Sequence, residues 1–261
     1  MTRTHVLYAF AVSLLITAAL TMTYQGGRSV ADFYHRIFPD TSVMKTQYPV
    51  AVAKVGPQIT YKFQKQRPPH WVNLGQISKQ AVAAILMSED SGFFQHHGYE
   101  PEAIRAAIEH NTKPGVKVKR GGSTITQQVV KNLFLSPEKT ITRKVRELLL
   151  AMEIERKYSK KKILETYLNI AEWGPGVYGI EQASQRYFKK NPADLTAHDA
   201  AVLAFMLPNP TKYQHSVRDG ELTAFAQKSV ETILERMWKT GHISDEEYTS
   251  SEVQEEIPSN L

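Results

Sequence analysis

The apolar residues of this chain recur mainly at every third or fourth position, the spacing of one face of an α-helix. The pattern predicts helices over residues 77–87, 101–111, 138–158, 178–188, 197–207 and 221–240, with another between Ser159 and the Gly174-Pro175-Gly176 turn. Strand-like alternation is seen over residues 59–64. The chain is therefore predicted to be mainly α.

Capping signals support several of these helix boundaries. Ser159 stands directly before one predicted helix, and Thr196 with Asp199 has the spacing of a capping box for the helix that stops at Pro208. The glycine pair Gly121-Gly122 leads into hydroxyl residues and then a helix start. The free amides and the dipole at such a helix terminus favour an anion.

The N-terminal region differs from the rest of the chain. Residues 6–27 contain no charged residue, and about 20 residues of helix span about 30 Å, enough to cross a bilayer. We predict a membrane anchor over residues 1–27, with a cleaved signal peptide as the alternative. Five prolines then predict an irregular tether over residues 28–70. A single domain over residues 71–244 follows, and an acidic tail over residues 245–261, opening with a short helix capped by Ser244, ends the chain.

Composition narrows the possible chemistry. The 261 residues include no cysteine, so disulfides and thiolate metal sites are excluded. The net charge is +6, but the first 244 residues hold all 32 Lys and Arg and 20 of the 26 Asp and Glu, a balance of +12. A body with this charge attracts phosphates, whether of nucleic acid, anionic lipid or a pyrophosphate substrate.

The first candidate for chemistry is the carboxylate pair Glu89 and Asp90, where an apolar helix ends beside Phe93 and Phe94. Adjacent like charges near aromatic rings raise the pKa of one carboxyl group and leave the other ionised, which provides a general base near neutral pH. A solvated helix end is the simpler interpretation of the same pair. Arg143 and Glu147, four residues apart, likewise fit a plain helix-surface ion pair.

Five motifs, ordered along residues 70–215, together resemble those of the peptidoglycan glycosyltransferases, the lysozyme-like family of bacterial wall polymerases. They are Glu89-Asp-x-x-Phe-x-x-His-x-Gly98, Gly121-Gly-Ser-Thr-Ile-Thr-Gln-Gln-x-x-Lys-Asn132, Arg143-Lys-x-x-Glu147, Ile163-Leu-Glu-x-Tyr-Leu-Asn169 with Gly174-x-Gly-x-Tyr-Gly179, and Leu203–Pro210. The chain departs from the family pattern at Gln182 and Lys189. Ser136-x-x-Lys139 and Lys239-Thr-Gly241 imitate transpeptidase motifs, but no Ser-x-Asn accompanies them, so a monofunctional transferase is expected.

The resemblance implies a lysozyme-like glycosyltransferase fold with a larger globular lobe and a smaller membrane-proximal lobe, preceded by one transmembrane helix. It implies polymerisation of lipid II with inversion and release of undecaprenyl pyrophosphate. Glu89 would be the general base, supported by Asp90, Phe93 and His96, and Glu147 would be catalytic in the donor site. The implied substrate-binding residues are Lys119, Arg120, Gly122, Ser123, Thr124, Gln128, Lys131, Asn132, Arg143, Lys144 and Asn169, the last securing the frame of the site.

The same resemblance sets the expected surroundings. No cofactor is required, and a divalent metal (Mg²⁺ or Mn²⁺) is compatible with pyrophosphate departure although no ligand cluster stands out. Expected partners are lipid II, the growing glycan and the membrane, with other wall-synthesis or division proteins as further candidates and no nucleic acid. The expected location is the bacterial inner membrane, single-pass, with the catalytic domain on the periplasmic or extracytoplasmic side.

Two other functions are compatible with parts of the sequence. A lysozyme-like wall glycosidase would also use a catalytic Glu, but hydrolysis needs no pyrophosphate site. A non-catalytic membrane-anchored scaffold for wall synthesis would have no need of Glu89, Lys131 and Glu147 together.

Overall fold

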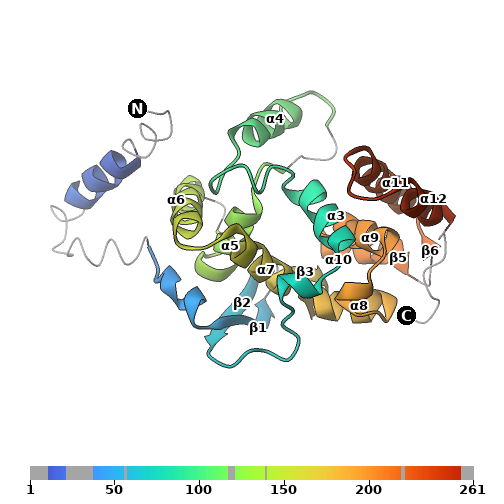
Figure 1. Cartoon of the computed structure of the whole chain (residues 1–261). Helices are drawn as coiled ribbons and strands as arrows, with labels where there is room; N and C mark the ends of the chain where they lie inside the picture. Colours follow the sequence, from blue (N-terminus) through green and yellow to red (C-terminus); the bar gives the residue numbers. More distant parts are fainter. Residues whose placement is uncertain are drawn as a thin grey trace. The chain divides into compact units, whose positions relative to one another are not determined.

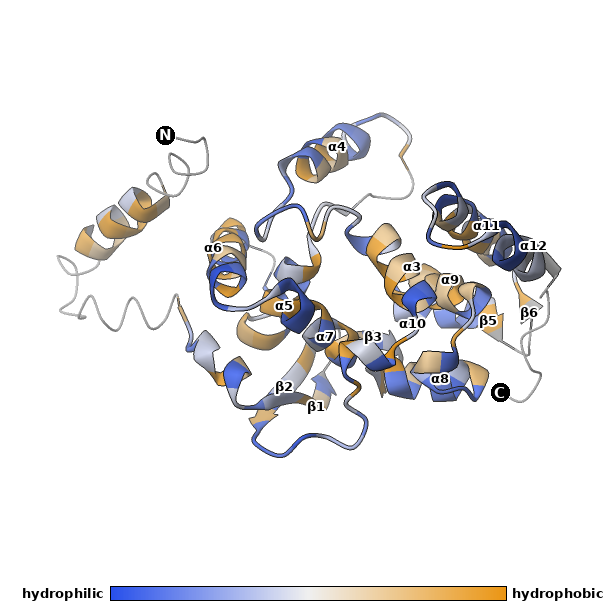
Figure 2. Ribbon diagram, in the orientation of Figure 1, coloured by the Kyte–Doolittle hydropathy of each residue, from blue (hydrophilic) through white to orange (hydrophobic). Residues whose placement is uncertain are grey.

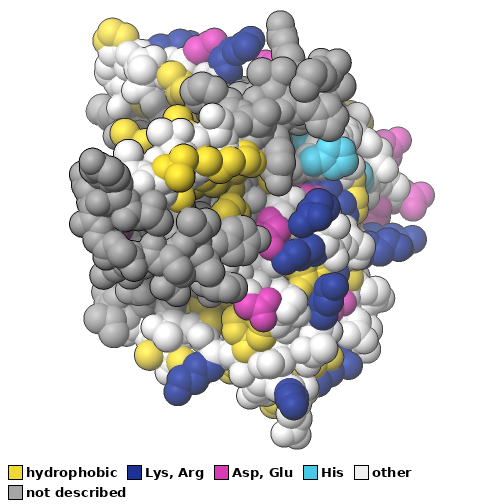
Figure 3. All heavy atoms as spheres, turned by 90° about the vertical axis from the view of Figure 1, so that its left-hand side faces the viewer, with side chains coloured by type: hydrophobic (Ala, Val, Ile, Leu, Met, Phe, Trp, Pro, Cys, Tyr) yellow, Lys and Arg dark blue, Asp and Glu magenta, His cyan; other side chains and the backbone are white. Residues whose placement is uncertain are grey.

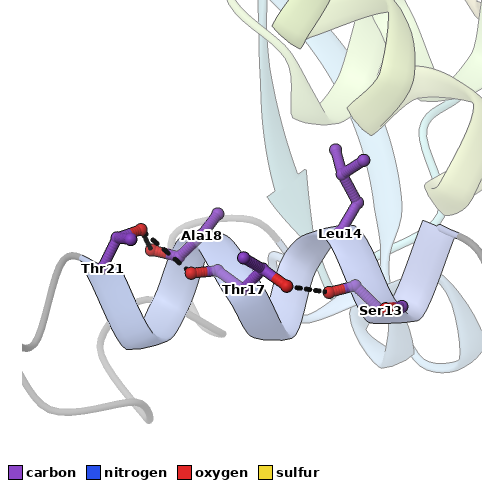
Figure 4. A pocket seen from close by; sticks show the side chains of 5 residues that line it. All are labelled: Ser13, Leu14, Thr17, Ala18 and Thr21. Carbon is purple, nitrogen blue, oxygen red and sulfur yellow. Dashed lines mark hydrogen bonds between the residues drawn. The ribbon is translucent and has the colours of Figure 1, made fainter.

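The computed structural model describes residues 11–21, 38–55, 58–116, 121–138, 140–218 and 221–253. The chain forms two compact units, residues 1–45 and residues 46–261. The first contains helical residues 11–21 and a 3₁₀-helix, η1 (Thr41–Lys45). Figure 4 shows three hydroxyl side chains spaced four residues apart on the first helix: Thr17 donates to the Ser13 carbonyl, and Thr21 donates to the Thr17 and Ala18 carbonyls, each over 2.9 Å. The Thr17 and Thr21 hydroxyls are thus satisfied by the backbone of their own helix.

Within the described ranges, we find no helix that combines the length and the apolar character needed to span a membrane. The predicted anchor over residues 1–27 falls largely outside those ranges, since only residues 11–21 of it are described.

The second unit is mainly helical, which confirms the predicted class (Figure 1). Its elements in order are β1 (Tyr48–Val55), β2 (Gln58–Gln64), η2 (Leu74–Gln76), α3 (Lys79–Glu89), α4 (Pro101–Asn111), α5 (Ile125–Phe134), α6 (Ile141–Lys157), α7 (Lys160–Ile170), β3 (Glu172–Gly174), β4 (Val177–Tyr178), α8 (Ile180–Phe188), η3 (Pro192–Asp194), α9 (Ala197–Met206), α10 (Pro210–Tyr213), η4 (Gln214–Ser216), β5 (Val217–Arg218), β6 (Glu221–Leu222), α11 (Ala224–Lys239) and α12 (Asp245–Val253).

The core is centred on α9, whose ten residues are all buried. Helix α3 lies beside α9, and α11 packs against both (Figure 1). Figure 2 colours α3 and α9 largely in the hydrophobic range, whereas α11 and α12 are mostly hydrophilic. The Ser88 hydroxyl donates to the Ala204 carbonyl over 3.3 Å, so the carboxyl ends of α3 and α9 lie side by side. This packing fixes the end of α3, where Glu89 stands.

A second group of contacts surrounds α5, which packs against both α6 and α7 and also meets β2. Phe63 of β2 stacks on Phe134 at the end of α5, with ring centroids 5.8 Å apart. Tyr167 of α7 is 1% exposed, so α5 and α7 share a closely packed interior. Helix α5 therefore has its position set from three sides.

The prediction of irregular structure over residues 28–70 is wrong for residues 48–55. They form β1, which pairs antiparallel with β2 from Tyr48–Gln64 to Val55–Gln58. Pro49 weakened the sequence signal, yet proline is tolerated near the start of an edge strand. The Tyr61 hydroxyl donates to the Ile170 carbonyl over 2.7 Å and fastens the hairpin to α7. The compact unit accordingly begins at Thr46, earlier than the predicted boundary at residue 71.

The helix signals were largely correct. Thr124, Ser159 and Thr196 each accept a hydrogen bond from a backbone amide in the first turn of the helix that follows. The helix expected from residue 221 starts at Ala224 because residues 221–222 pair with β5. The helix expected from residue 178 starts at Ile180, after Gly179 at φ 83°. Residues 245–253 form α12, and the rest of the acidic tail lies outside the described residues.

Candidate active site

Glu89 and Asp90 stand where the carboxyl end of α3 meets the amino end of α5. Glu89 is the last residue of α3, and its Oε2 accepts a hydrogen bond from the Gln128 amide over 2.7 Å. Asp90 Oδ2 accepts from the Ile125 backbone amide, the first of α5, over 2.9 Å. Both carboxylates are therefore directed at the start of α5, although Glu89 and Asp90 are 39 and 35 residues away in the chain from the residues that they contact.

The two neighbours occupy opposite ends of helix dipoles. Glu89 is at the negative end of α3, whereas Asp90 lies at the positive end of α5, which favours its negative charge. Burial raises the pKa of the Glu89 carboxyl group. The Gln128 hydrogen bond and the charge of Lys131 act in the opposite direction, and the charge of Asp90 adds to the increase. The raised pKa agrees with the sequence prediction, but burial contributes more to it than the like-charged neighbour does.

Tyr167 is a site residue that the sequence analysis missed. Its hydroxyl is a further hydrogen-bond partner of Glu89, and burial followed by the charge of Glu89 raises the pKa of this phenol well above its ordinary value. In the sequence Tyr167 belongs to the inward-facing stripe of α7 and was read as core. The available signal was the hydroxyl itself, since a fully buried tyrosine usually has a hydrogen-bond partner.

His96 joins the two ends of the first motif. Its Nε2 lies 2.9 and 3.0 Å from the two oxygens of Asp90, and its Nδ1 accepts from the Gly98 amide over 3.2 Å. Because Nδ1 is an acceptor, this network assigns the ring proton to Nε2 and the neutral tautomer to His96. Thr124, the N-cap of α5, donates to the Gly98 carbonyl over 2.8 Å. The loop after α3 is thus tied to the start of α5 at several points.

Gly98 itself fits where no other residue would. Its φ is 94°, and a Cβ atom there would lie 2.9 Å from the Ala151 carbonyl carbon of α6. Helix α6 also carries Glu147, so the close approach of loop and helix fixes the spacing between the two motifs. This explains physically why a glycine follows His96 in the pattern.

A cationic cluster surrounds Glu147, whose side chain is 2% exposed. Glu147 accepts from Arg143 Nη1 over 2.5 Å and also from Lys144, which in addition donates to the Ser123 hydroxyl over 2.8 Å. The predicted i,i+4 ion pair of Arg143 and Glu147 is therefore present. The cluster brings the second and third motifs together.

Lys131 of α5 is influenced electrostatically by both acidic centres. Its side chain keeps contact with solvent, but partial desolvation by the surrounding protein lowers the pKa of its ammonium group. Glu147 has the next largest effect and opposes this decrease, Arg143 adds to it, and Glu89 opposes it. Since Lys131 is influenced by both glutamates, Glu89 and the cluster around Glu147 belong to one site.

The remaining predicted residues have varied positions. Asn169 donates to the Val72 and Glu165 carbonyls and accepts from the Val72 amide, all over 2.8 Å, which fits the predicted frame role. A Cβ at Gly122 would lie 3.1 Å from the Ala103 carbonyl oxygen of α4. Asn132 is partly exposed, and Phe93 is fully buried. Lys119 and Arg120 lie outside the described residues.

Two observations bear on ligands. In the described ranges, no three His, Cys, Asp or Glu residues come together as a possible metal site. Figure 3 shows Lys and Arg side chains next to Asp and Glu side chains on one face of the molecule. Among the described residues visible on that face, basic side chains are interspersed with acidic ones.

The chain is similar to one known family and to several individual proteins. Residues 56–238 match the family described as Transglycosylase. The biosynthetic peptidoglycan transglycosylase of Thiobacillus denitrificans is 46% identical over 145 residues, which cover 56% of this chain and 62% of that protein. The protein of the same name from Bordetella pertussis is 42% identical over 189 residues, covering 71% and 76%. Penicillin-binding protein 1F of Bacillus subtilis is 34% identical over 241 residues, covering 92% and 32%.

Proposed function

Because this chain belongs to the transglycosylase family, we propose that it polymerises lipid II into the glycan strands of the bacterial cell wall. The observation that carries the proposal is that the start of α5 meets both acidic centres: Gln128 donates to Glu89, and Ser123, just before α5, accepts from the Lys144 that also donates to Glu147. A carboxylate of raised pKa and a cationic cluster thereby share one site. A sugar transfer that releases pyrophosphate needs both of these groups.

Glu89 would act as the general base. The O4 hydroxyl of the acceptor sugar gives its proton to Glu89 as the O4–C1 bond forms to the terminal sugar of the growing chain. The bond from C1 to the pyrophosphate oxygen breaks, and its electron pair leaves with the undecaprenyl pyrophosphate. Attack opposite the leaving group inverts the configuration at C1. The raised pKa of Glu89 makes it a stronger base than an exposed carboxylate, provided that it is deprotonated at the working pH.

The cationic cluster would bind the pyrophosphate. Lys131, Arg143 and Lys144 carry the positive charge, and Ser123 contributes its hydroxyl group beside Lys144. Charge that develops on the departing oxygen is stabilised most by groups that already face it. Glu147 holds Arg143 and Lys144 in place and leaves the proton transfer to Glu89.

Gln128 would have a role different from the expected direct contact with substrate. Its amide donates to Glu89, so it orients the carboxylate and favours the ionised form. Thr124 is buried, and its hydroxyl already donates to the Gly98 carbonyl and accepts from the Gln127 amide as the cap of α5. Thr124 would therefore stabilise the frame of the site rather than bind substrate. Gly122, Asn132, Lys119 and Arg120 remain candidates for direct substrate contacts.

We further propose a lysozyme-like arrangement of two lobes and a membrane anchor over residues 1–27, with the domain on the extracytoplasmic side of the inner membrane. The uncharged run of residues 6–27 supports the anchor, and a lipid-linked substrate would be met at the membrane plane. Other wall-synthesis or division proteins are candidate partners there.

A divalent metal is a separate question. Glu147 already accepts from two cations, so a metal ion would compete with Arg143 and Lys144 for its oxygens. Where Mg²⁺ or Mn²⁺ does bind, it would add positive charge at the pyrophosphate. Comparing rates in EDTA and in Mg²⁺ tests this directly.

The deciding experiment gives labelled lipid II to the purified full-length protein and separates polymer from substrate by gel electrophoresis. We expect polymer that muramidase digests back to disaccharide units. A glycosidase would instead release soluble fragments from isolated cell walls, and a scaffold would do neither. Failure to form polymer, with the protein folded and the lipid dispersed, would refute the proposal.

A further inference from the structure

A closed ring of contacts lies behind the proposed base. Glu155 of α6 accepts from the Thr126 hydroxyl of α5 over 2.5 Å and from Lys160 Nζ of α7 over 2.8 Å. The Lys160 ammonium lies over the Phe93 ring, 4.4 Å from its centroid. The Phe93 ring meets the edge of His96, with centroids 6.1 Å apart. His96 binds Asp90, and Asp90 returns to α5 at Ile125, next to Thr126.

The members of this ring are nearly all removed from solvent. Phe93 and Thr126 are 0% exposed, and the Glu155 and Lys160 side chains are 4% and 18% exposed. Buried charges are retained only where they are paired and hydrogen-bonded, and here each charge has two partners. The proposed chemistry uses neither Glu155 nor Lys160, so it does not explain why a charged pair is kept at this depth.

The geometry points to an answer: we infer that the Glu155–Lys160 pair is a positioning device for the active site. It holds α5 through Thr126 and the loop after α3 through Phe93, on both sides of the contact between Asp90 and Ile125. This inference rests on the proposed function, because the device would act on Glu89 and Gln128. Lys160 touches no reacting group and is a positioning residue.

The ring of contacts holds the end of α3 and the start of α5 in one relative orientation. Glu89 and Gln128 belong to different helices, and their 2.7 Å hydrogen bond forms only if the end of α3 and the start of α5 keep their relative orientation. A cation over an aromatic face is strongest when water is excluded, as it is for Phe93. Lys160 and Glu155 also join the start of α7 to the end of α6, so four elements meet at one pair of charges.

The chain offers a matched control. Lys190 Nζ lies 2.6 Å from Asp199 Oδ2, and the Asp199 side chain is 7% exposed. This pair has the same chemistry and a similarly buried carboxylate, but Asp199 caps α9 and has no contact with the ring among the described interactions. Loss of either lysine leaves one buried carboxylate without its cation.

The experiment compares Lys160→Met, Lys160→Arg and Lys190→Met in full-length protein. We expect Lys160→Met to lower kcat by on the order of ten- to a hundredfold with KM unchanged, because a small misplacement of reacting groups has effects of this size. Lys160→Arg keeps the cation over Phe93 and should retain most of the rate. Lys190→Met should lower Tm similarly to Lys160→Met while keeping the parent kcat.

A second readout does not depend on activity. The ¹⁵N signals of His96, assigned by their loss in His96→Gln, should show a single Nε2-protonated tautomer in the parent and in Lys190→Met. Lys160→Met should shift or mix these signals, because Phe93 loses the cation that holds its ring and can then move relative to His96. If Lys160→Met does not fold, the double variant Lys160→Met/Glu155→Gln removes the unpaired charge and is measured instead.

The inference is overturned if Lys160→Met keeps the parent kcat and His96 signals. It is also overturned if Lys190→Met loses as much kcat, or if Lys160→Arg loses as much as Lys160→Met. If the parent makes no polymer at all, the proposed function fails, and the His96 signals alone then decide whether the pair positions the loop.

Discussion

Replacing Glu89 by Gln tests the site most directly, because the change removes one proton-accepting group and little else. Gln has nearly the same shape, and its side-chain oxygen can still accept the hydrogen bond that Gln128 now donates to Glu89 over 2.7 Å. The packing at the end of α3 should therefore be kept. Loss of a general base lowers a rate by about 10²–10⁴-fold, which is about 3–5 kcal/mol of transition-state stabilisation.

The assay is the pH dependence of kcat/KM on lipid II. Because the pKa of Glu89 is raised above its ordinary value of 4.5, the parent should lose activity on acidification with a midpoint above that value. Glu89→Gln should lack this acidic limb in whatever rate remains. Glu172→Gln serves as the control and should keep the parent profile, because its carboxylate is paired with Lys54 and not with Glu89 or the cationic cluster.

The same substitution, Glu89→Gln, should lower activity but raise the stability of the folded protein near neutral pH. A carboxyl group whose pKa is raised on folding contributes stability that is fully present below its unfolded pKa and is lost as pH rises through the folded pKa. Ionised Glu89 thus destabilises the folded protein near neutral pH, so Glu89→Gln should have a higher Tm than the parent at pH 7 but not at pH 4. A variant that retains more than a few per cent of the rate, or whose Tm falls at pH 7, would refute the assignment of Glu89 as a buried base.

Three further outcomes are expected. Glu147→Gln should slow turnover and weaken donor binding, because Arg143 and Lys144 lose their shared anion, while the acidic limb of the pH–rate profile keeps its midpoint. If the acidic limb disappears in Glu147→Gln but persists in Glu89→Gln, the roles of the two glutamates are reversed. Asp90→Asn should lower Tm by roughly 3–12 °C, since one of its two donors, His96 or the Ile125 amide, must then face an amide NH₂ group. The control is Asp194→Asn, at an exposed position. Equal Tm values for the two variants would contradict the role of Asp90. Removing residues 1–27 should leave a folded enzyme that uses liposome-borne lipid II poorly, and equal rates on liposomes and in detergent would show that this segment does not serve substrate access.

Features with a local cause could be predicted from the sequence. The caps at Thr124, Ser159 and Thr196 act on amides within the next three residues, so their spacing is visible in the chain. The motifs likewise identified Glu89 and Glu147 because each lies in a short pattern. The raised pKa of Glu89 was expected from its neighbours, although burial turned out to be the larger cause.

Features that depend on distant partners could not be predicted in this way. Asp90 meets Ile125, and Tyr167 meets Glu89, only because α3, α5 and α7 pack together. Nothing near Lys160 in the sequence indicates that its ammonium lies over Phe93. Strand β1 was missed because Pro49 obscured a short alternating run whose partner strand decides its structure.

Gly98 has a consequence for how this site can change under selection. A side chain there would strain the backbone, whose φ is 94°, and its Cβ would clash with the Ala151 carbonyl carbon at 2.9 Å. Relief would require the backbone of α6 to shift, and with it Glu147 and the cations that it holds. A compound that bridges Glu89 and the cationic cluster would therefore depend on the distance between these two groups. No single substitution at residue 98 can adjust that distance. Resistance to such a compound would have to arise elsewhere, by changes of charge rather than of spacing.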